Sequence, residues 1–209
     1  MRDVFISGED DATRAVIKRL LSDYNPNLHI IQSLPARGSE IKSKIGAFNE
    51  LARQYPVILL TDLDDAPCAP IGKNNLLAGL TKSPEFVINI ACDEVEAWLM
   101  ADTNGFANYF GIPIAAMPQF LPQKMQGRKP LSEISVNVKS SWHFTHQLAH
   151  SSQKADIKAQ IAVPIEDKTC KGKEYNTAVV PFIENVWRPE IGRINSDSLN
   201  RMIRRIERL

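Results

Sequence analysis

Acidic side chains gather at three places in the first half of the sequence, each at the end of a short apolar run. They are Glu9, Asp10 and Asp11, then Asp62, Asp64 and Asp65, and finally Asp93, Glu94 and Glu96. Carboxylate oxygens are the ligands that Mg²⁺ and Mn²⁺ prefer, and carboxylates brought together without a cation repel one another and raise each other's pKa. A single acidic group is typical of helix caps and solvated loops. The three groups together favour a divalent metal site.

Alternating strand and helix patterns predict how these acids are positioned. Short apolar runs at 3–7, 28–33, 56–62 and 86–91 predict strands, and amphipathic stretches between them predict helices. This alternation predicts an α/β fold, a Rossmann-like doubly wound parallel sheet with right-handed crossovers. Functional residues gather past the carboxyl ends of the strands in such sheets. If the first, third and fourth strands lie side by side, the three acidic groups share one cleft.

The strand–helix alternation fades after residue 103. We therefore expect an α/β core over 1–103 and a mainly helical region over 104–209 that packs on the core. Helical patterns occur at 104–110, 141–161 and 175–187, and a final amphipathic helix carries an apolar stripe over 199–206. The stretches 66–72 and 113–130 contain several prolines and predict loops.

Charge divides the chain in the same place, although its net charge is only +1. Residues 1–103 contain 10 Lys and Arg against 15 Asp and Glu, whereas residues 104–209 contain 15 against 9. An acidic half suits divalent cations, and a basic half suits the phosphates of DNA or RNA. Candidate phosphate contacts are Arg128 and Lys129, and on the last helix Arg201, Arg204, Arg205 and Arg208.

Composition excludes several classes of protein. With 44% hydrophobic and 23% charged residues, the chain is neither a disordered tail nor a fibrous repeat. It contains no signal-peptide pattern and no apolar run of about 20 residues, so we expect no membrane association. Cys68, Cys92 and Cys170 form no CxxC pair, and we expect reduced thiols and a cytoplasmic location.

Three motifs in the first half carry a resemblance to a known family. The strand ending in Gly8–Glu9 and the DxD of Asp62 and Asp64 resemble the Toprim domain of topoisomerases, primases and overcoming-lysogenization-defect nucleases. The segment EVEAWLMAD, residues 94–102, resembles the EVEAWLLAD segment of a stand-alone Toprim-like bacterial family, and Arg37–Gly38 is similar to its glycine loop. The resemblance covers 1–103. It implies a Mg²⁺-dependent nuclease, of bacterial defence or repair, that hydrolyses phosphodiester bonds and has a partner ATPase.

The resemblance also implies metal ligands. Asp62 and Asp64 hold the ion that bridges the substrate phosphate, and Asp11 is a further ligand. Glu94 or Glu96 completes a second metal site, as in the overcoming-lysogenization-defect nucleases. A divalent ion lowers the pKa of bound water and neutralises charge on the phosphoryl group.

Catalytic roles follow from the same resemblance. Glu9 is the general acid or base on the attacking or leaving oxygen. A lysine from the basic half, Lys173 or Lys171, stabilises the transition state. Toprim domains usually place the glutamate immediately before the glycine, whereas this chain has Ser7–Gly8–Glu9. Either Glu9 substitutes from two residues later, or the acid/base is missing.

A missing acid/base would fit an alternative function, a non-catalytic binding module or a receiver-like signalling module with Asp62 as phosphoacceptor. A receiver also has an acidic pair after its first strand, here Asp10 and Asp11. A receiver has a serine or threonine at the end of its fourth strand, where this chain has the acidic sequence Cys92–Asp93–Glu94.

Three histidines form a separate pattern. His143, His146 and His150 recur at helical spacing, which a zinc site can use. No cysteine or carboxylate lies near them in the sequence. The pattern therefore favours an amphipathic helix with half-buried histidines.

Overall fold

The computed structural model of the chain describes residues 1–38, 40–120, 133–169 and 171–209. Its centre is a four-stranded, all-parallel sheet in the order β2-β1-β3-β4. The strands are β1 (Arg2–Gly8), β2 (Leu28–Ser33), β3 (Val57–Asp62) and β4 (Phe86–Ala91). The predicted α/β, Rossmann-like architecture is confirmed, and β1, β3 and β4 lie side by side as expected.

Burial on both faces explains the apolar sequence of β3. Ile58 and Leu60 point into the core on one face of the sheet, and Val57 and Leu59 point into the core on the other. The register aligns Asp62 with Ala91 of β4 and Leu60 with Gly8 of β1. The carboxyl ends of these three strands are therefore nearly level, which places the residues that follow them at one edge.

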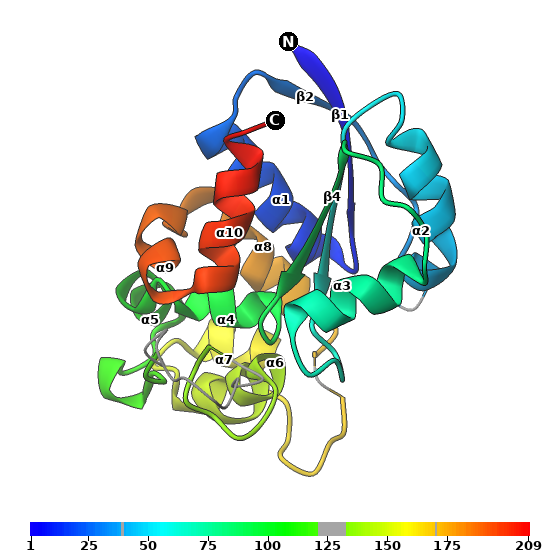
Figure 1. Cartoon of the computed structure of the whole chain (residues 1–209). Coiled ribbons are helices and arrows are strands. Elements are labelled where there is room, and N and C mark those ends of the chain that lie inside the picture. The colour runs from blue at the N-terminus through cyan, green and yellow to red at the C-terminus, as the bar shows by residue number, and fades with distance from the viewer. Residues whose placement is uncertain (39, 121–132, 170) are drawn as a thin grey trace.

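Helices cover both faces of the sheet (Figure 1). On one face lie α2 (Glu40–Leu51) and α3 (Ala69–Leu77), which pack against β3 and β4. On the other face lie α1 (Asp11–Tyr24), α8 (Tyr175–Asn185) and α10 (Asp197–Ile206). Because α1 packs against both α8 and α10, the first helix and the last helices of the chain lie together on this face of the sheet.

The remaining helices follow β4 and pack on the same core. They are α4 (Val95–Met100), α5 (Thr103–Phe110), η1 (Ile114–Ala116), α6 (Ser140–His143), the π-helical turn η2 (Phe144–Leu148), the 3-10 turn η3 (Ala149–Ser151), α7 (Ala155–Ile161) and α9 (Pro189–Asn195). One hydrophobic cluster joins Val4 and Ile58 of the sheet to Phe182 and Ile206 of the last helices. Residues from both halves of the sequence therefore share one core.

Several local expectations need correction. The predicted loop over 66–72 gives way to α3 at Ala69, because Pro70 stands in the first turn, where proline is tolerated. The expected helix over 141–161 is broken: the Ser152 hydroxyl donates to the carbonyl of Phe110 and accepts from the amide of Lys154. Arg128 and Lys129 lie outside the described residues.

Within the described ranges, no helix has both the length and the apolar composition that crossing a membrane requires.

Candidate functional site

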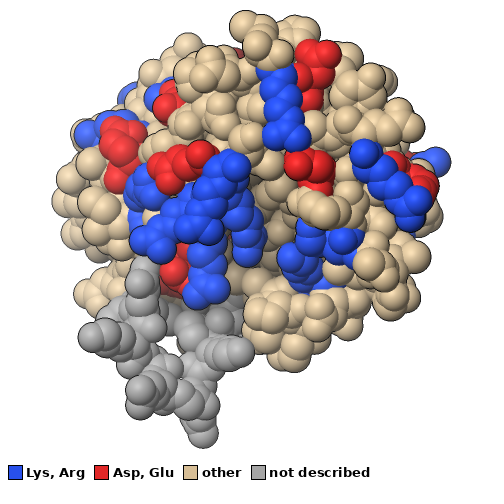
Figure 2. All heavy atoms as spheres, turned by 45° about the horizontal axis from the view of Figure 1, so that its top comes forward, with Lys and Arg blue, Asp and Glu red and all other residues tan. Residues whose placement is uncertain are grey.

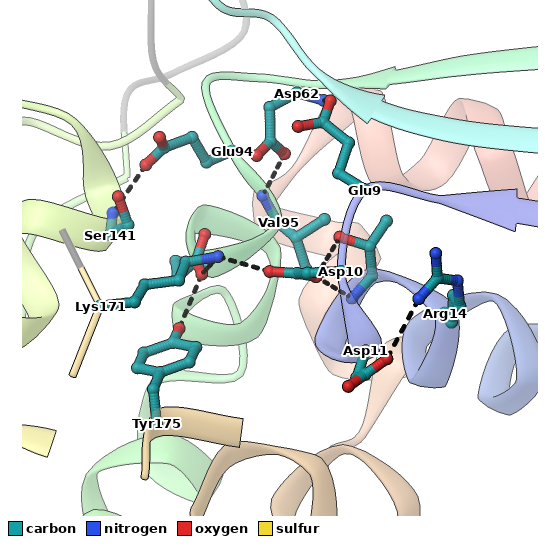
Figure 3. A network of polar contacts seen from close by, with 12 residues as sticks. Glu9, Asp10, Asp11, Arg14, Asp62, Glu94, Val95, Ser141, Lys171 and Tyr175 are labelled. Atoms are coloured by element: carbon teal, nitrogen blue, oxygen red, sulfur yellow. Dashed lines mark hydrogen bonds and ion pairs between the residues drawn. The ribbon is translucent and has the colours of Figure 1, made fainter. Parts of the chain in front are cut away.

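Carboxylates from three strand ends meet at the carboxyl edge of the sheet (Figure 3). Glu9 and Asp10 follow β1, Asp62 ends β3, and Glu94 and Glu96 stand at the start of α4, after β4. These five residues are referred to below as the acidic site. Strand order and register bring them together, because the chain leaves three adjacent parallel strands at the same edge.

Glu9 ties the end of β1 to the end of β3. Its Oε1 accepts a hydrogen bond from the backbone amide of Asp62 at 3.0 Å and another from the hydroxyl of Thr61. Thr61 is buried, so this contact fixes the Glu9 carboxylate against the carboxyl end of β3. Two carboxylates that are 53 positions apart in sequence are thereby held beside each other.

Asp62 points from the sheet toward α4. It follows Ile58 and Leu60 on the same face of the strand, and its Oδ1 accepts a hydrogen bond from the amide of Val95 at 3.0 Å. Burial, with the neighbouring carboxylates of Glu96 and Glu9, raises the pKa of Asp62 well above its ordinary value. Without a further cation, the site therefore favours a protonated Asp62.

Lys171 is a cation that contacts two of these acids. Its Nζ lies 2.8 Å from Asp10 Oδ2 and 2.8 Å from Glu96 Oε1, and the hydroxyl of Tyr175 donates to the same Glu96 oxygen at 2.6 Å. Burial acts to lower the pKa of Lys171, but the charges of Glu96 and Asp10 outweigh burial and raise it. The ammonium group is therefore held in its charged form.

Asp10 also caps α1. Its Oδ1 accepts hydrogen bonds from the amide of Thr13 at 2.8 Å and from the Thr13 hydroxyl at 2.7 Å. Burial acts to raise the pKa of Asp10, but Lys171 and these hydrogen bonds outweigh it and lower the pKa. Asp10 thus stays ionised and positions Lys171.

The two glutamates after β4 differ in the hydrogen-bond and ion-pair partners of their oxygens. Glu94 Oε2 accepts from the amide of Ser141 at 2.8 Å, and its Oε1 lies 3.8 Å from Lys139 Nζ. Burial and the charge of Glu96 raise the pKa of Glu94. The second oxygen of Glu96, Oε2, is buried and has no hydrogen-bond partner among the described residues. A buried acceptor of this kind is costly unless it gains a donor or a cation.

A cleft opens beside the acidic site on the face of the sheet that α2 and α3 cover. Its volume is about 820 Å³, and Glu9, Asp62, Asp64 and Asp65 line it. Lys42 of α2 also lines the cleft, with Nζ 3.8 Å from Asp64 Oδ2. Asp64 has a φ of 49°, a left-handed conformation that aspartate tolerates better than most residues. The cleft gives solvent access to Glu9 and Asp62.

The structure brings together four of the seven predicted site residues, namely Glu9, Asp62, Glu94 and Glu96. Asp64 lines the cleft instead. Asp11 is exposed, turned toward Arg14 at 3.1 Å and away from Lys171 (Figure 3). Lys173 is also exposed, and Lys171, the other lysine considered, makes the contacts with the acids.

Tyr175 and Thr61 take part in the site, although no sequence motif marks them. Tyr175 is fully buried, and its hydroxyl reaches a carboxylate 79 positions earlier in the chain. In the described part of the chain, no group of three or more His, Cys, Asp or Glu side chains forms a ready-made metal site. The ammonium group of Lys171 already bridges Asp10 and Glu96, so a metal ion would have to bind to the remaining carboxylate oxygens.

The three histidines do not converge on one point. His143 Nδ1 contacts Gln147 Oε1 at 2.6 Å, His146 Nε2 contacts the carbonyl of Asp167 at 3.0 Å, and His150 Nε2 contacts the carbonyl of Val163 at 2.8 Å. They lie in α6, η2 and η3 rather than in one regular helix. Different partners hold them, which favours a structural role.

Cys92, next to the acidic site, is a thiol for which we expect low reactivity. Burial, with the neighbouring Glu133 carboxylate, raises its pKa from 9.0 to about 12. Because the thiolate is the nucleophile, we expect iodoacetamide to alkylate native Cys92 about 1,000-fold more slowly than an ordinary thiol at pH 8. Peptide mass spectrometry of timed samples measures the rate, and the denatured chain supplies the reference. Equal rates in native and denatured protein would contradict the prediction.

Comparison with known proteins adds one finding. Residues 7–149 match the model of the family described as a domain of unknown function, DUF4276. This match includes all five residues of the acidic site and ends before Lys171 and Tyr175. No curated protein and no solved structure matches the chain. Because the matched region spans more than half of the sequence, the chain belongs to the DUF4276 family.

Proposed function

We propose that this protein is a nuclease that uses Mg²⁺ or Mn²⁺ to hydrolyse phosphodiester bonds in nucleic acid. The observation that carries the proposal is the acidic site, where five carboxylates from three strand ends meet two lysines, Lys171 and Lys139. Negative charge exceeds positive charge there, and burial makes the excess costly. A divalent cation is the partner that would neutralise it.

Carboxylate oxygens are the type of donor that such an ion prefers. Glu96 Oε2 is a buried oxygen with no partner in the described chain. Burial, together with neighbouring carboxylates, raises the pKa of both Asp62 and Glu94. Asp62, Glu94 and Glu96 would hold the ion. When bound, a divalent cation neutralises charge on the phosphoryl group and lowers the pKa of water.

The other residues would act on the substrate. Glu9, which lines the cleft beside Asp62, would hold or accept the proton of the attacking or leaving oxygen. Lys42 and Lys139 stand near the acids and would contact the substrate phosphate. Lys171 would keep Asp10 and Glu96 in place through its two ion pairs. The proposal includes a cytoplasmic location and a partner ATPase.

Two measurements on the same samples test this function. Supercoiled plasmid, single-stranded DNA and RNA are incubated with the protein in Mn²⁺, Mg²⁺ or EDTA, and thermal unfolding is recorded in each condition. We expect cleavage of at least one substrate with a divalent ion, no cleavage in EDTA, and a higher Tm with Mn²⁺. Asp62→Asn should remove the Tm shift and slow cleavage about 1,000-fold, as the loss of several kcal/mol of transition-state stabilisation implies.

The matched control is Asp156→Asn, which removes an exposed carboxylate from α7. It should cleave and bind Mn²⁺ as the unmodified protein does. Equal cleavage by Asp62→Asn would identify a contaminating nuclease and contradict the proposal, as would a flat Mn²⁺ titration. A Tm shift without cleavage of any substrate would favour the alternative, a metal-binding module without hydrolysis.

A further inference from the structure

A second concave surface lies at the opposite end of β4 from the acidic site. It is a groove of about 370 Å³ at the free edge of the sheet, between α3 and α10. Its charged lining residues are Arg2, Lys73, Lys82, Glu85, Arg205 and Arg208. Figure 2 turns the end of the molecule that carries both termini toward the viewer, and many Lys and Arg side chains gather on this face. This surface is called the basic groove below.

Carboxylates do not neutralise the central cations of the basic groove. Within the described ranges, Lys73, Lys82 and Arg205 take part in no ion pair. The acidic side chain in the lining, Glu85, is bound to Arg2 at 2.6 Å, and Arg2 also donates to the backbone oxygen of Leu209 at 2.8 Å. The positive charge of the groove is therefore available to an outside anion.

Neutral oxygen atoms hold two of these cations in place. Lys82 Nζ donates to the carbonyls of Ser83 at 2.6 Å and Phe86 at 2.9 Å. Arg205 Nη1 donates to Asn89 Oδ1 at 2.6 Å. Such contacts fix the position of a charge without cancelling it, which is the arrangement that a prepared anion site needs.

Mutual repulsion among the cations supports the same conclusion. Burial and the charge of Arg205 lower the pKa of Lys73. Burial, with the charges of Lys73 and Arg205, lowers the pKa of Lys82. An anion between these side chains would remove the repulsion.

The position of the groove relative to the acidic site indicates which anion. The groove lies along Phe86, Val87 and Ile88, and β4 then runs to Ala91, just before Glu94. Six residues of a parallel strand span about 20 Å, roughly the rise of six nucleotides in one strand of DNA. Residue Lys73 of the groove also belongs to α3, which supplies Gly72 and Leu76 to the wall of the cleft.

We propose that the basic groove binds the phosphate backbone of a nucleic acid strand whose scissile bond lies at the acidic site. The inference rests on the proposed nuclease function and names a contact surface for its substrate. Lys73, Lys82 and Arg205 would each contact a phosphate, which gives affinity without reading base sequence.

Fluorescence anisotropy with labelled single-stranded DNA, duplex DNA and RNA tests the proposal in EDTA, at salt from about 50 to 200 mM. Each phosphate contact contributes about −0.9 to the slope of log affinity against log salt for duplex DNA and about −0.7 for a single strand. Lys73→Ala/Lys82→Ala should therefore weaken binding at least about tenfold and reduce the magnitude of the slope by about 1.4 to 1.8. Lys73→Arg/Lys82→Arg should keep most of the affinity.

The matched control is Lys44→Ala/Arg53→Ala, which removes the same charge from exposed positions on and just after α2. Its affinity should stay within about twofold of the unmodified protein. Because Lys82 contacts backbone carbonyls, Arg208→Glu provides a second variant, at an exposed residue of the groove, and should also weaken binding.

Three results would overturn the proposal. The first is unchanged oligonucleotide binding by the groove variants, and the second is competition by AMP that is as strong as competition by an oligonucleotide at the same total phosphate concentration. The third is binding to phosphatidylserine vesicles but to no nucleic acid. EDTA separates this test from the test of catalysis. Binding through the groove without any cleavage would contradict only the nuclease function. Cleavage that the groove variants leave unchanged, with unchanged binding, would contradict only the groove.

Discussion

Replacing Lys171 with methionine should destabilise the fold by about 3 kcal/mol, near the low end for breaking a buried ion pair. Methionine keeps the length of the aliphatic part of the side chain but removes the ammonium group that lies 2.8 Å from both Asp10 and Glu96. Glu96 is 1% exposed and would lose its cation, whereas Asp10 is 28% exposed and would regain some hydration. Urea unfolding at constant pH in EDTA measures the change.

Lys173→Met is the matched control, two positions away on an exposed side chain. It should change the free energy of unfolding by less than about 0.5 kcal/mol, as most surface substitutions do. If both variants are equally stable, Lys171 does not neutralise a buried carboxylate. Lys171→Arg should recover only part of the lost stability, because a planar guanidinium does not reproduce the geometry of an ammonium between two carboxylates.

Replacing Asp62 with asparagine should change how stability depends on pH. The folded state raises the pKa of Asp62, so the protonated acid contributes stability that is fully present below the unfolded pKa, about 3.9, and is lost as pH rises through the folded pKa. Asparagine is neutral at every pH and keeps an oxygen for the amide of Val95. In EDTA, the variant should therefore gain stability relative to the unmodified protein as pH rises, by up to about 1.4 kcal/mol per pH unit.

Urea unfolding across a pH series measures this difference. Asp64→Asn is the control, because it makes the same change at a carboxylate that is 47% exposed. A constant difference between Asp62→Asn and the unmodified protein at all pH values would mean that Asp62 titrates alike in the folded and unfolded states. That outcome would remove the crowding of carboxylates on which the proposed metal site depends.

The acidic site was predictable because its main parts follow from sequence-local rules. An unbroken apolar run such as VILLTD predicts a buried parallel strand, and parallel strands direct their following residues to one edge. Glu9, Asp62 and Glu94 could be placed together on that basis. The same rules could not decide whether Asp10 or Asp11 points into the site. That choice depends on where α1 begins and on the cap that Asp10 forms.

The basic groove shows the limit of reading charge along the chain. The excess of Lys and Arg after residue 103 predicts a basic second half, yet Lys73 and Lys82 of the groove come from the acidic first half. Arg205 joins them only because α10 packs beside β4. Surface electrostatics depend on which segments become neighbours after folding, and net charge per segment contains no such information.

The amino-acid sequence by itself determined the strands, their parallel arrangement and the edge where the acids meet, because hydrophobic periodicity acts over a few residues at a time. Only the tertiary structure decided that Lys171 and Tyr175 complete the site, that Glu96 keeps a buried oxygen without a partner, and that the basic groove forms. The contacts of Lys171 and Tyr175 with Glu96 join residues 75 and 79 positions apart. Packing of the last helices against the sheet fixes such distances, and no local pattern specifies them.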